Sequence, residues 1–157
     1  MKLLAYEVDK RSFLGVLNED ETWVYPVSAA GMEYRSMKDL IREAGPSEME
    51  MLDYISKKMP GDVTGAASVE EIKVVSPIAE PDQDIICLGI NYMDHAKESA
   101  RFKKEEFSKP EKAIYFSKRV NRTNDPDGII PAHKNLTNQL DYEAELAVII
   151  KLSLIHI

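Results

Sequence analysis

One stretch decides how the second half of the chain is read: Cys87-Leu88-Gly89-Ile90-Asn91-Tyr92-Met93-Asp94-His95-Ala96-Lys97-Glu98. The apolar residues 85–88, which end at Gly89, predict a short strand buried on both faces, and the glycine would allow a close backbone approach. A helix follows, capped by Asn91 or Asp94, which would place His95 and Glu98 on one face. A carboxylate beside an imidazole raises its basicity, so the pair could take a proton from water and return it. The alternative is an incidental pair on a solvated helix, which is commoner on spacing alone.

A second acidic segment lies downstream: Asp141-Tyr142-Glu143-Ala144-Glu145-Leu146, followed by the apolar residues 147–150. The alternation predicts a strand over 142–150 that enters a core, with Glu143 and Glu145 on the same face. Paired carboxylates can face solvent, share a proton or bind a cation. As hard oxygen ligands, they suit Mg²⁺, Mn²⁺ or Ca²⁺ better than zinc.

Between these segments the pattern is less specific. Residues 113–116 predict a strand, and Lys118 just past its end could hold a substrate carboxylate, although a solvated lysine is the commoner case. His133 is interpreted as a turn residue and Cys87 as a buried core thiol, a poor nucleophile in apolar surroundings. The sequence has no Gly-rich phosphate loop, no zinc-type Cys/His spacing and no Gly-x-Ser-x-Gly elbow.

The first part of the chain predicts a small α+β module. Residues 3–27 alternate as strands of a meander with a polar turn at 18–21. Ser36 is expected to cap a helix with an apolar stripe, and Ser47 with Glu50 to form a capping box that opens a second helix. The stripe of the first helix is Met37, Leu40, Ile41 and Ala44, and that of the second is Met51, Leu52 and Ile55. A Pro-rich, acidic stretch then suggests a boundary, so we expect domains at 1–76 and 77–150, with a tail at 151–157.

Composition limits the classes of partner. The 157 residues are 44% hydrophobic and 30% charged, which is enough to bury a core and unlike a disordered acidic tail. A net charge of −7 without a Lys/Arg cluster argues against nucleic acid and anionic lipid. The single Cys87 excludes an intramolecular disulfide and fits a reducing compartment. With no signal peptide and no apolar run long enough to span a bilayer, we expect a soluble, cytoplasmic protein.

Taken in this order, with Phe116-Ser117-Lys118 between them, the two motif segments resemble the fumarylacetoacetate hydrolase family from about Pro77 to Ile150. The resemblance implies an α+β protein in which a small N-terminal module precedes the beginning of a mixed β-roll, usually as a homodimer. Glu143 and Glu145 would bind Mg²⁺, Mn²⁺ or Ca²⁺, with Asp94 as a further acidic group near the metal. His95 and Glu98 would activate water, and Lys118 and Tyr92 would bind substrate.

The resemblance also implies substrates, namely small 2-oxo or 1,3-dicarbonyl acids of the kind met in aromatic catabolism. The expected reaction is metal-dependent hydrolysis of a carbon–carbon bond in an acylpyruvate or fumarylacetoacetate-like acid. Isomerisation of a hydroxymuconate-type diacid and decarboxylation of oxaloacetate would use the same site. The family's third metal carboxylate, an aspartate, is expected downstream, and residues 151–157 depart from the family pattern. The sequence therefore predicts a C-terminally truncated reading frame, and the alternatives are an inactive fragment or a plain acidic binding module.

Overall fold

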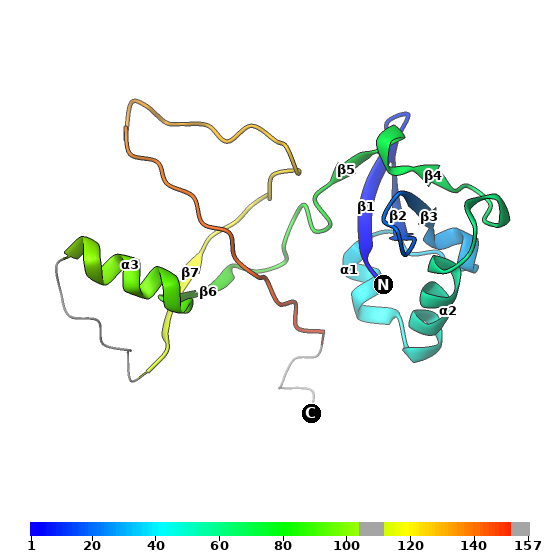
Figure 1. Ribbon diagram of the computed structural model, residues 1–157, viewed down its shortest axis with the longest axis horizontal. Coiled ribbons are helices and arrows are strands. Elements are labelled where there is room, and N and C mark those ends of the chain that lie inside the picture. The colour runs from blue at the N-terminus through cyan, green and yellow to red at the C-terminus, as the bar shows by residue number, and fades with distance from the viewer. Residues whose placement is uncertain (104–111, 152–157) are drawn as a thin grey trace. The chain divides into compact units, whose positions relative to one another are not determined.

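The computed structural model describes residues 1–103 and 112–151, apart from the side chains of His95, Glu98, Ser99, Phe102 and Lys103. The strands are β1 Leu3–Val8, β2 Arg11–Leu17, β3 Trp23–Pro26, β4 Ala67–Ser68, β5 Lys73–Val75, β6 Ile85–Gly89 and β7 Ile114–Lys118 (Figure 1). The α-helices are α1 Met37–Glu43, α2 Pro46–Ser56 and α3 Met93–Lys103, and three short 3-10 helices cover Val27–Ala30, Pro60–Asp62 and Val69–Glu71. One compact unit comprises residues 1–79 with the described residues from 124 onward, and the other comprises the described residues of 80–123. The predicted α+β class is confirmed.

The first unit contains a five-stranded antiparallel sheet in the order β4-β3-β2-β1-β5. Its longest ladder joins β1 to β2, from Leu3 opposite Val16 to Val8 opposite Arg11. The side-chain oxygen of Asn18 accepts hydrogen bonds from the backbone of Thr22 at 2.9 Å and of Trp23 at 3.0 Å, which closes the turn before β3. The meander predicted for residues 3–27 is therefore confirmed.

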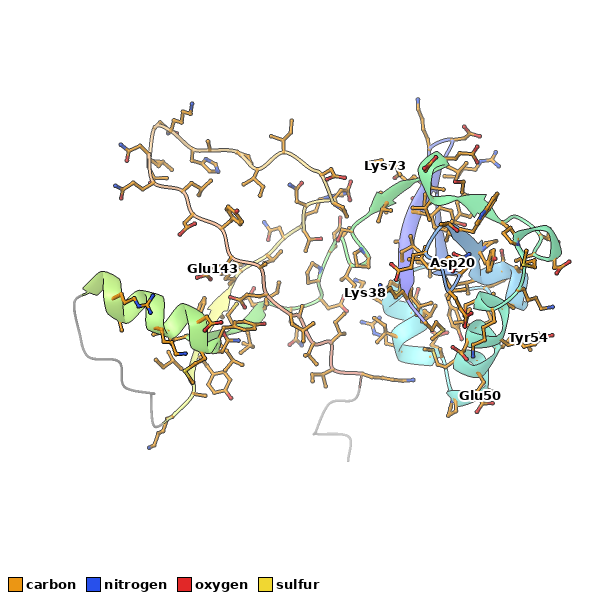
Figure 2. All side chains as sticks on the ribbon, viewed as in Figure 1. Asp20, Lys38, Glu50, Tyr54, Lys73 and Glu143 are labelled. Atoms are coloured by element: carbon orange, nitrogen blue, oxygen red, sulfur yellow. The ribbon has the colours of Figure 1, made fainter. Side chains whose placement is uncertain are left out.

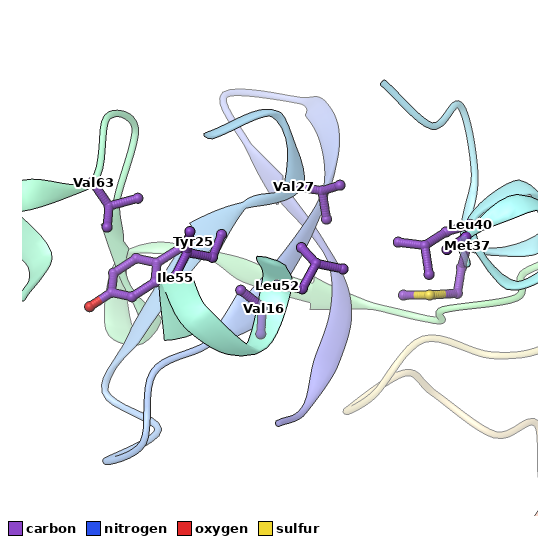
Figure 3. Close-up of a cluster of buried hydrophobic side chains, with 9 residues drawn as sticks. Val16, Tyr25, Val27, Met37, Leu40, Leu52, Ile55 and Val63 are labelled. Carbon is purple, nitrogen blue, oxygen red and sulfur yellow. The ribbon is translucent and has the colours of Figure 1, made fainter. Parts of the chain in front are cut away.

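Helices α1 and α2 supply apolar side chains to the main core of this unit (Figure 3). Its buried members are Val16, Tyr25, Val27, Met37, Leu40, Ala44, Leu52, Ile55 and Val63. Ser36 caps α1 as predicted, because its hydroxyl accepts a hydrogen bond from the Asp39 backbone at 3.2 Å. Most of the predicted apolar stripes are buried, but the side chain of Met51 is 44% exposed.

The capping box predicted at Ser47 and Glu50 is wrong by two residues. Helix α2 begins at Pro46 with Gly45 as its N-cap, and the carboxylate of Glu48 accepts the Gly45 N–H at 3.1 Å. The physical reason is Pro46, whose missing N–H and fixed φ suit the first helical position. A proline at that position starts the helix before Ser47 can act as the cap.

The second unit contains an antiparallel pair, in which Ile85 faces Lys118 and Gly89 faces Ile114, and helix α3. The expectation that β6 is buried on both faces is wrong: Ile86 is 68% exposed, and Cys87 is only partly buried. Among the described residues of 80–123, Ala96 alone is buried. An apolar run shows that a strand suits a core, but the strand is buried only when other elements cover its faces.

Residues 124–151 contain no helix or strand, so the strand predicted for 142–150 is absent from this structure. A strand requires a backbone ladder with a neighbouring strand, and the two sheets of the described residues do not include this segment. His133 opens a turn as predicted, because its carbonyl accepts the Leu136 N–H at 2.7 Å. Within the described ranges, no helix has the length and apolar character needed to cross a membrane.

Candidate functional site

The link from β6 to α3 carries the central motif. A Cβ added to Gly89 would lie 3.4 Å from Cγ2 of Ile114, which is ordinary contact, so the close backbone approach expected at this glycine is not seen here. The unusual backbone belongs to the next residue, since Ile90 has a φ of 54°. A β-branched residue seldom adopts this left-handed conformation. The sequence pattern does not predict this conformation, because an isoleucine is not a typical turn residue.

Helix α3 begins directly after this link. The Tyr92 carbonyl accepts the Ala96 N–H at 3.0 Å, which makes Tyr92 the N-cap residue in place of the expected Asn91 or Asp94. His95 and Glu98 both lie in α3, three positions apart, so the helix predicted after Asn91 is confirmed. Their side chains lie outside the described part of the structure, and their pairing stays a prediction.

Two further residues of the motif are solvent-accessible. The side chain of Asp94 is fully exposed, with its Oδ1 3.8 Å from Nζ of Lys97, one helical turn away. Tyr92 is 43% exposed at the N-terminus of the helix. Asp94 is therefore fully exposed to solvent and Tyr92 partly exposed.

Lys118 is the last residue of β7, whereas the sequence predicted that it lies just past the end of the strand. Its Nζ lies 5.8 Å from the centroid of the Phe116 ring on the same face of the strand. Lys118 pairs with Ile85, whereas the motif leaves the ladder at Gly89. At the usual rise, the two ends of this ladder are about 13 Å apart along the strand. The pairing of β6 with β7 therefore does not by itself bring Lys118 to the start of α3.

Glu143 and Glu145 are exposed, in a segment without secondary structure (Figure 2). No three His, Cys, Asp or Glu side chains gather into a possible metal site in the part of the chain that the structure describes. The chemistry of the pair nevertheless fits a hard divalent cation, because both are carboxylates and such ions prefer oxygen ligands. The two glutamates belong to the first unit and the motif residues to the second, so their convergence stays a prediction.

Asp125 was missed by the sequence analysis, although it makes contacts far along the chain. Its Oδ1 accepts the Ser76 N–H at 2.9 Å and its Oδ2 lies 3.2 Å from Nζ of Lys73. The only sequence signal was the abundance of turn formers around it, which indicates a turn but names no partner.

Residues 84–156 match the family model described as fumarylacetoacetate (FAA) hydrolase C-terminal. Residues 84–156 are thus similar to the C-terminal domain of the FAA hydrolase family, and the resemblance drawn from the motif segments is confirmed.

Three curated relatives align along nearly the whole chain. The chain is 32% identical over 160 residues to "Oxaloacetate tautomerase YisK" of Bacillus subtilis, covering 96% of this chain and 52% of the relative. It is 29% identical to an uncharacterized protein of Staphylococcus epidermidis and 28% identical to one of Staphylococcus aureus, each over 161 residues, 96% of this chain and 51% of the relative. The chain therefore spans about half the length of the curated relatives that it matches.

Proposed function

We propose that the complete protein carrying this chain is a divalent-metal-dependent enzyme that acts on small 2-oxo or 1,3-dicarbonyl acids. Its reaction is hydrolysis of a carbon–carbon bond in an acylpyruvate or fumarylacetoacetate-like acid. The observation that supports this most is the family match of residues 84–156, which includes the helix carrying His95 and Glu98 and the segment carrying Glu143 and Glu145.

The protein groups divide the work by chemistry. His95 takes a proton from the attacking water and returns it to the leaving carbon, while Glu98 fixes the imidazole tautomer and stabilises its charged form. Lys118 and Tyr92 bind oxygens of the substrate. Catalysis by a positioned acid–base group of this kind contributes about 10²–10⁴ in rate.

Glu143 and Glu145 hold the cation, Mg²⁺ or Mn²⁺ with Ca²⁺ as an alternative, and Asp94 is a further acidic candidate. Two carboxylates supply only part of the coordination sphere of such an ion. When bound, the cation supplies Lewis-acid stabilisation of negative charge on the substrate oxygens. The protein is further proposed to be a cytoplasmic homodimer, with domains over 1–76 and 77–150.

Oxaloacetate keto–enol tautomerisation is the second candidate, because one of the matched relatives is named an oxaloacetate tautomerase. This reaction moves one proton between carbon and oxygen and consumes no water. The same imidazole could relay that proton, so the site chemistry suits both reactions. Isomerisation of a hydroxymuconate-type diacid also moves a proton, and decarboxylation of oxaloacetate releases CO2 and leaves an enolate that takes up a proton on carbon, so both are further alternatives for the same site.

The test is a substrate panel with the complete protein and Mn²⁺. Acylpyruvate cleavage is followed by loss of diketone absorbance, and enol oxaloacetate by its absorbance together with pyruvate release. His95→Asn is expected to lower kcat/KM about 10²–10⁴-fold. His133→Asn, at an exposed turn with a φ of 44°, is the matched control and is expected to keep wild-type activity. Unchanged turnover in His95→Asn would remove the imidazole from the mechanism.

The outcome also decides between the reactions. Cleavage products identify a hydrolase, loss of enol absorbance without pyruvate identifies a tautomerase, and pyruvate from oxaloacetate identifies a decarboxylase. Lack of metal-dependent turnover on the whole panel would contradict the proposal. The same assay on residues 1–157 alone tests the alternative of an inactive fragment.

A further inference from the structure

Residues 124–128 form a tight turn that contacts the end of the N-terminal sheet. The Gly128 N–H donates to the Asp125 carbonyl at 3.0 Å, and the side-chain amide of Asn124 donates to the Ile129 carbonyl at 3.2 Å. The strand β5 is one of the two edge strands of this sheet and lies next to β1. An edge strand carries unpaired backbone groups that a neighbouring segment can bind.

Asp125 makes that connection with both carboxylate oxygens. One accepts the backbone N–H of Ser76, just beyond β5, at 2.9 Å, and the other lies 3.2 Å from Nζ of Lys73 (Figure 2, where Lys73 is labelled). Nζ of Lys73 is also 3.8 Å from Oε2 of Glu7 on β1. The side chain of Asp125 is 29% exposed and that of Lys73 is 61% exposed. Because exposed ion pairs are weak, the charge-assisted bond to the Ser76 backbone is the stronger part.

The other end of the same segment is also fastened to the N-terminal module. Nζ of Lys151 donates to the carbonyl of Ala44 at 2.5 Å, at the C-terminus of α1. A lysine there satisfies a carbonyl that the helix leaves without a partner, and its charge complements the helix dipole. Glu143 and Glu145 lie between these two anchors, in a stretch with no helix or strand of its own to fix its course.

We infer that Asp125 is a positioning residue: it fastens the segment bearing Glu143 and Glu145 to the edge of the N-terminal sheet and so supports binding of the divalent cation. The effect on cation binding rests on the proposed function, in which Glu143 and Glu145 hold the divalent cation. The contacts to the Ser76 N–H and to Nζ of Lys73 fix both the position and the orientation of the Asp125 carboxylate, which a single contact would not do. The inference gives the N-terminal module a role as the scaffold for the carboxylate-bearing segment.

The test compares three variants of the complete protein. Asp125→Ala removes both contacts, whereas Asp125→Asn keeps an acceptor for the Ser76 N–H and loses only the charge. Asp127→Asn is the matched control, because Asp127 lies in the same turn, is exposed and has a φ of 59° that asparagine tolerates. The readouts are hydrogen exchange of the Ser76 amide and the Kd for Mn²⁺ alone, measured by calorimetry.

We expect Asp125→Ala to speed exchange of the Ser76 amide at least about 10-fold, because the amide loses its acceptor, and to raise the Kd for Mn²⁺. Asp125→Asn should restore most of both, and Asp127→Asn should match the wild type.

Faster Ser76 exchange in Asp125→Ala with an unchanged Kd would overturn the inference, because the contact would then be structural only. Unchanged exchange would overturn the contact itself. If the wild type binds no Mn²⁺, the metal site of the proposed function fails and the positioning role falls with it. Ser76 exchange then still decides the contact.

Discussion

At the scale of single residues, Glu48 shows how local hydrogen bonds set a titration. Its own backbone N–H, the Ser47 hydroxyl and the Gly45 N–H all bind the carboxylate at the start of α2. These bonds favour the charged form and hold the pKa of Glu48 below its ordinary value near 4.5. A lowered pKa in the folded state means that the group stabilises the fold above its unfolded pKa, and that this contribution is lost as the pH falls through the folded pKa.

The prediction compares wild type and Glu48→Gln in urea unfolding from about pH 7 to pH 3. The wild type should be the more stable at neutral pH, and the difference should shrink below about pH 5 as the carboxylate is protonated. Glu50→Gln, exposed on the same helix, serves as the control and should follow the wild type. Parallel curves for wild type and Glu48→Gln would show that the cap adds no pH-dependent stability.

At the scale of elements, Gly15 explains how closely β2 packs against its neighbours. It pairs with Leu4 on β1 and with Pro26 on β3. A Cβ at this position would overlap with Cγ2 of Val24 and lie 2.8 Å from Cε1 of Tyr6, and both of these side chains are buried. The sheet can therefore accept only glycine there without movement of its core.

Gly15→Ala is expected to destabilise the first unit by about 1–3 kcal/mol, the usual cost of overpacking a core. Gly61→Ala is the matched control, because no atom lies within 4 Å of the added Cβ there. Urea denaturation followed by fluorescence of Trp23 measures both. Equal stability of the two variants would mean that the sheet opens to accept a methyl group.

Some elements of the structure were predictable from the sequence and others were not. Strands β1–β3 and the Ser36 cap were predictable, because alternation and capping are local signals, whereas the short strands β4 and β5 were not predicted. The start of α2 was missed because Pro46 overrode the Ser47 pattern, and the burial of β6 was overestimated because burial depends on other elements. Asp125 could not be found, since its partner Ser76 lies 49 positions away in the sequence.

For the candidate site, the sequence predicted the helix that bears His95 and Glu98 and the family that residues 84–156 resemble. It could not predict the left-handed Ile90 that precedes the helix. Nor could the sequence predict that Lys118 pairs with Ile85, at the opposite end of the β6–β7 ladder from Gly89, since the pairing register depends on both strands.

At the scale of the whole molecule, buried apolar surface is distributed unevenly. Both core clusters, with the side chains packed against them, come from residues 3–78. In the β6–β7 strand pair, Ile86 and Tyr115 are 68% and 67% exposed. Ile129, beyond this pair, is 89% exposed. Regions with few buried contacts open at a small cost in free energy, so local stability should differ strongly along the chain.

Hydrogen exchange on the chain of 157 residues tests this expectation. Amides of β1–β3 should exchange at least about 100-fold more slowly than those of β6 and β7. Comparable protection in the two regions would mean that the faces of the β6–β7 strand pair are covered in solution. That result would contradict the uneven distribution of buried apolar surface.

The connection between β1 and β2 has a consequence for the pairing of these strands. Asp9 and Lys10 form this two-residue turn with φ angles of 49° and 63°, a geometry that Asn-Gly adopts far more readily. The ladder that this reversal closes is the longest of the sheet, and β3 and β5 attach to its two sides. The free energy that Asp9 and Lys10 lose in this left-handed turn therefore opposes closure of the hairpin, and the pairing of β1 with β2 has to offset it.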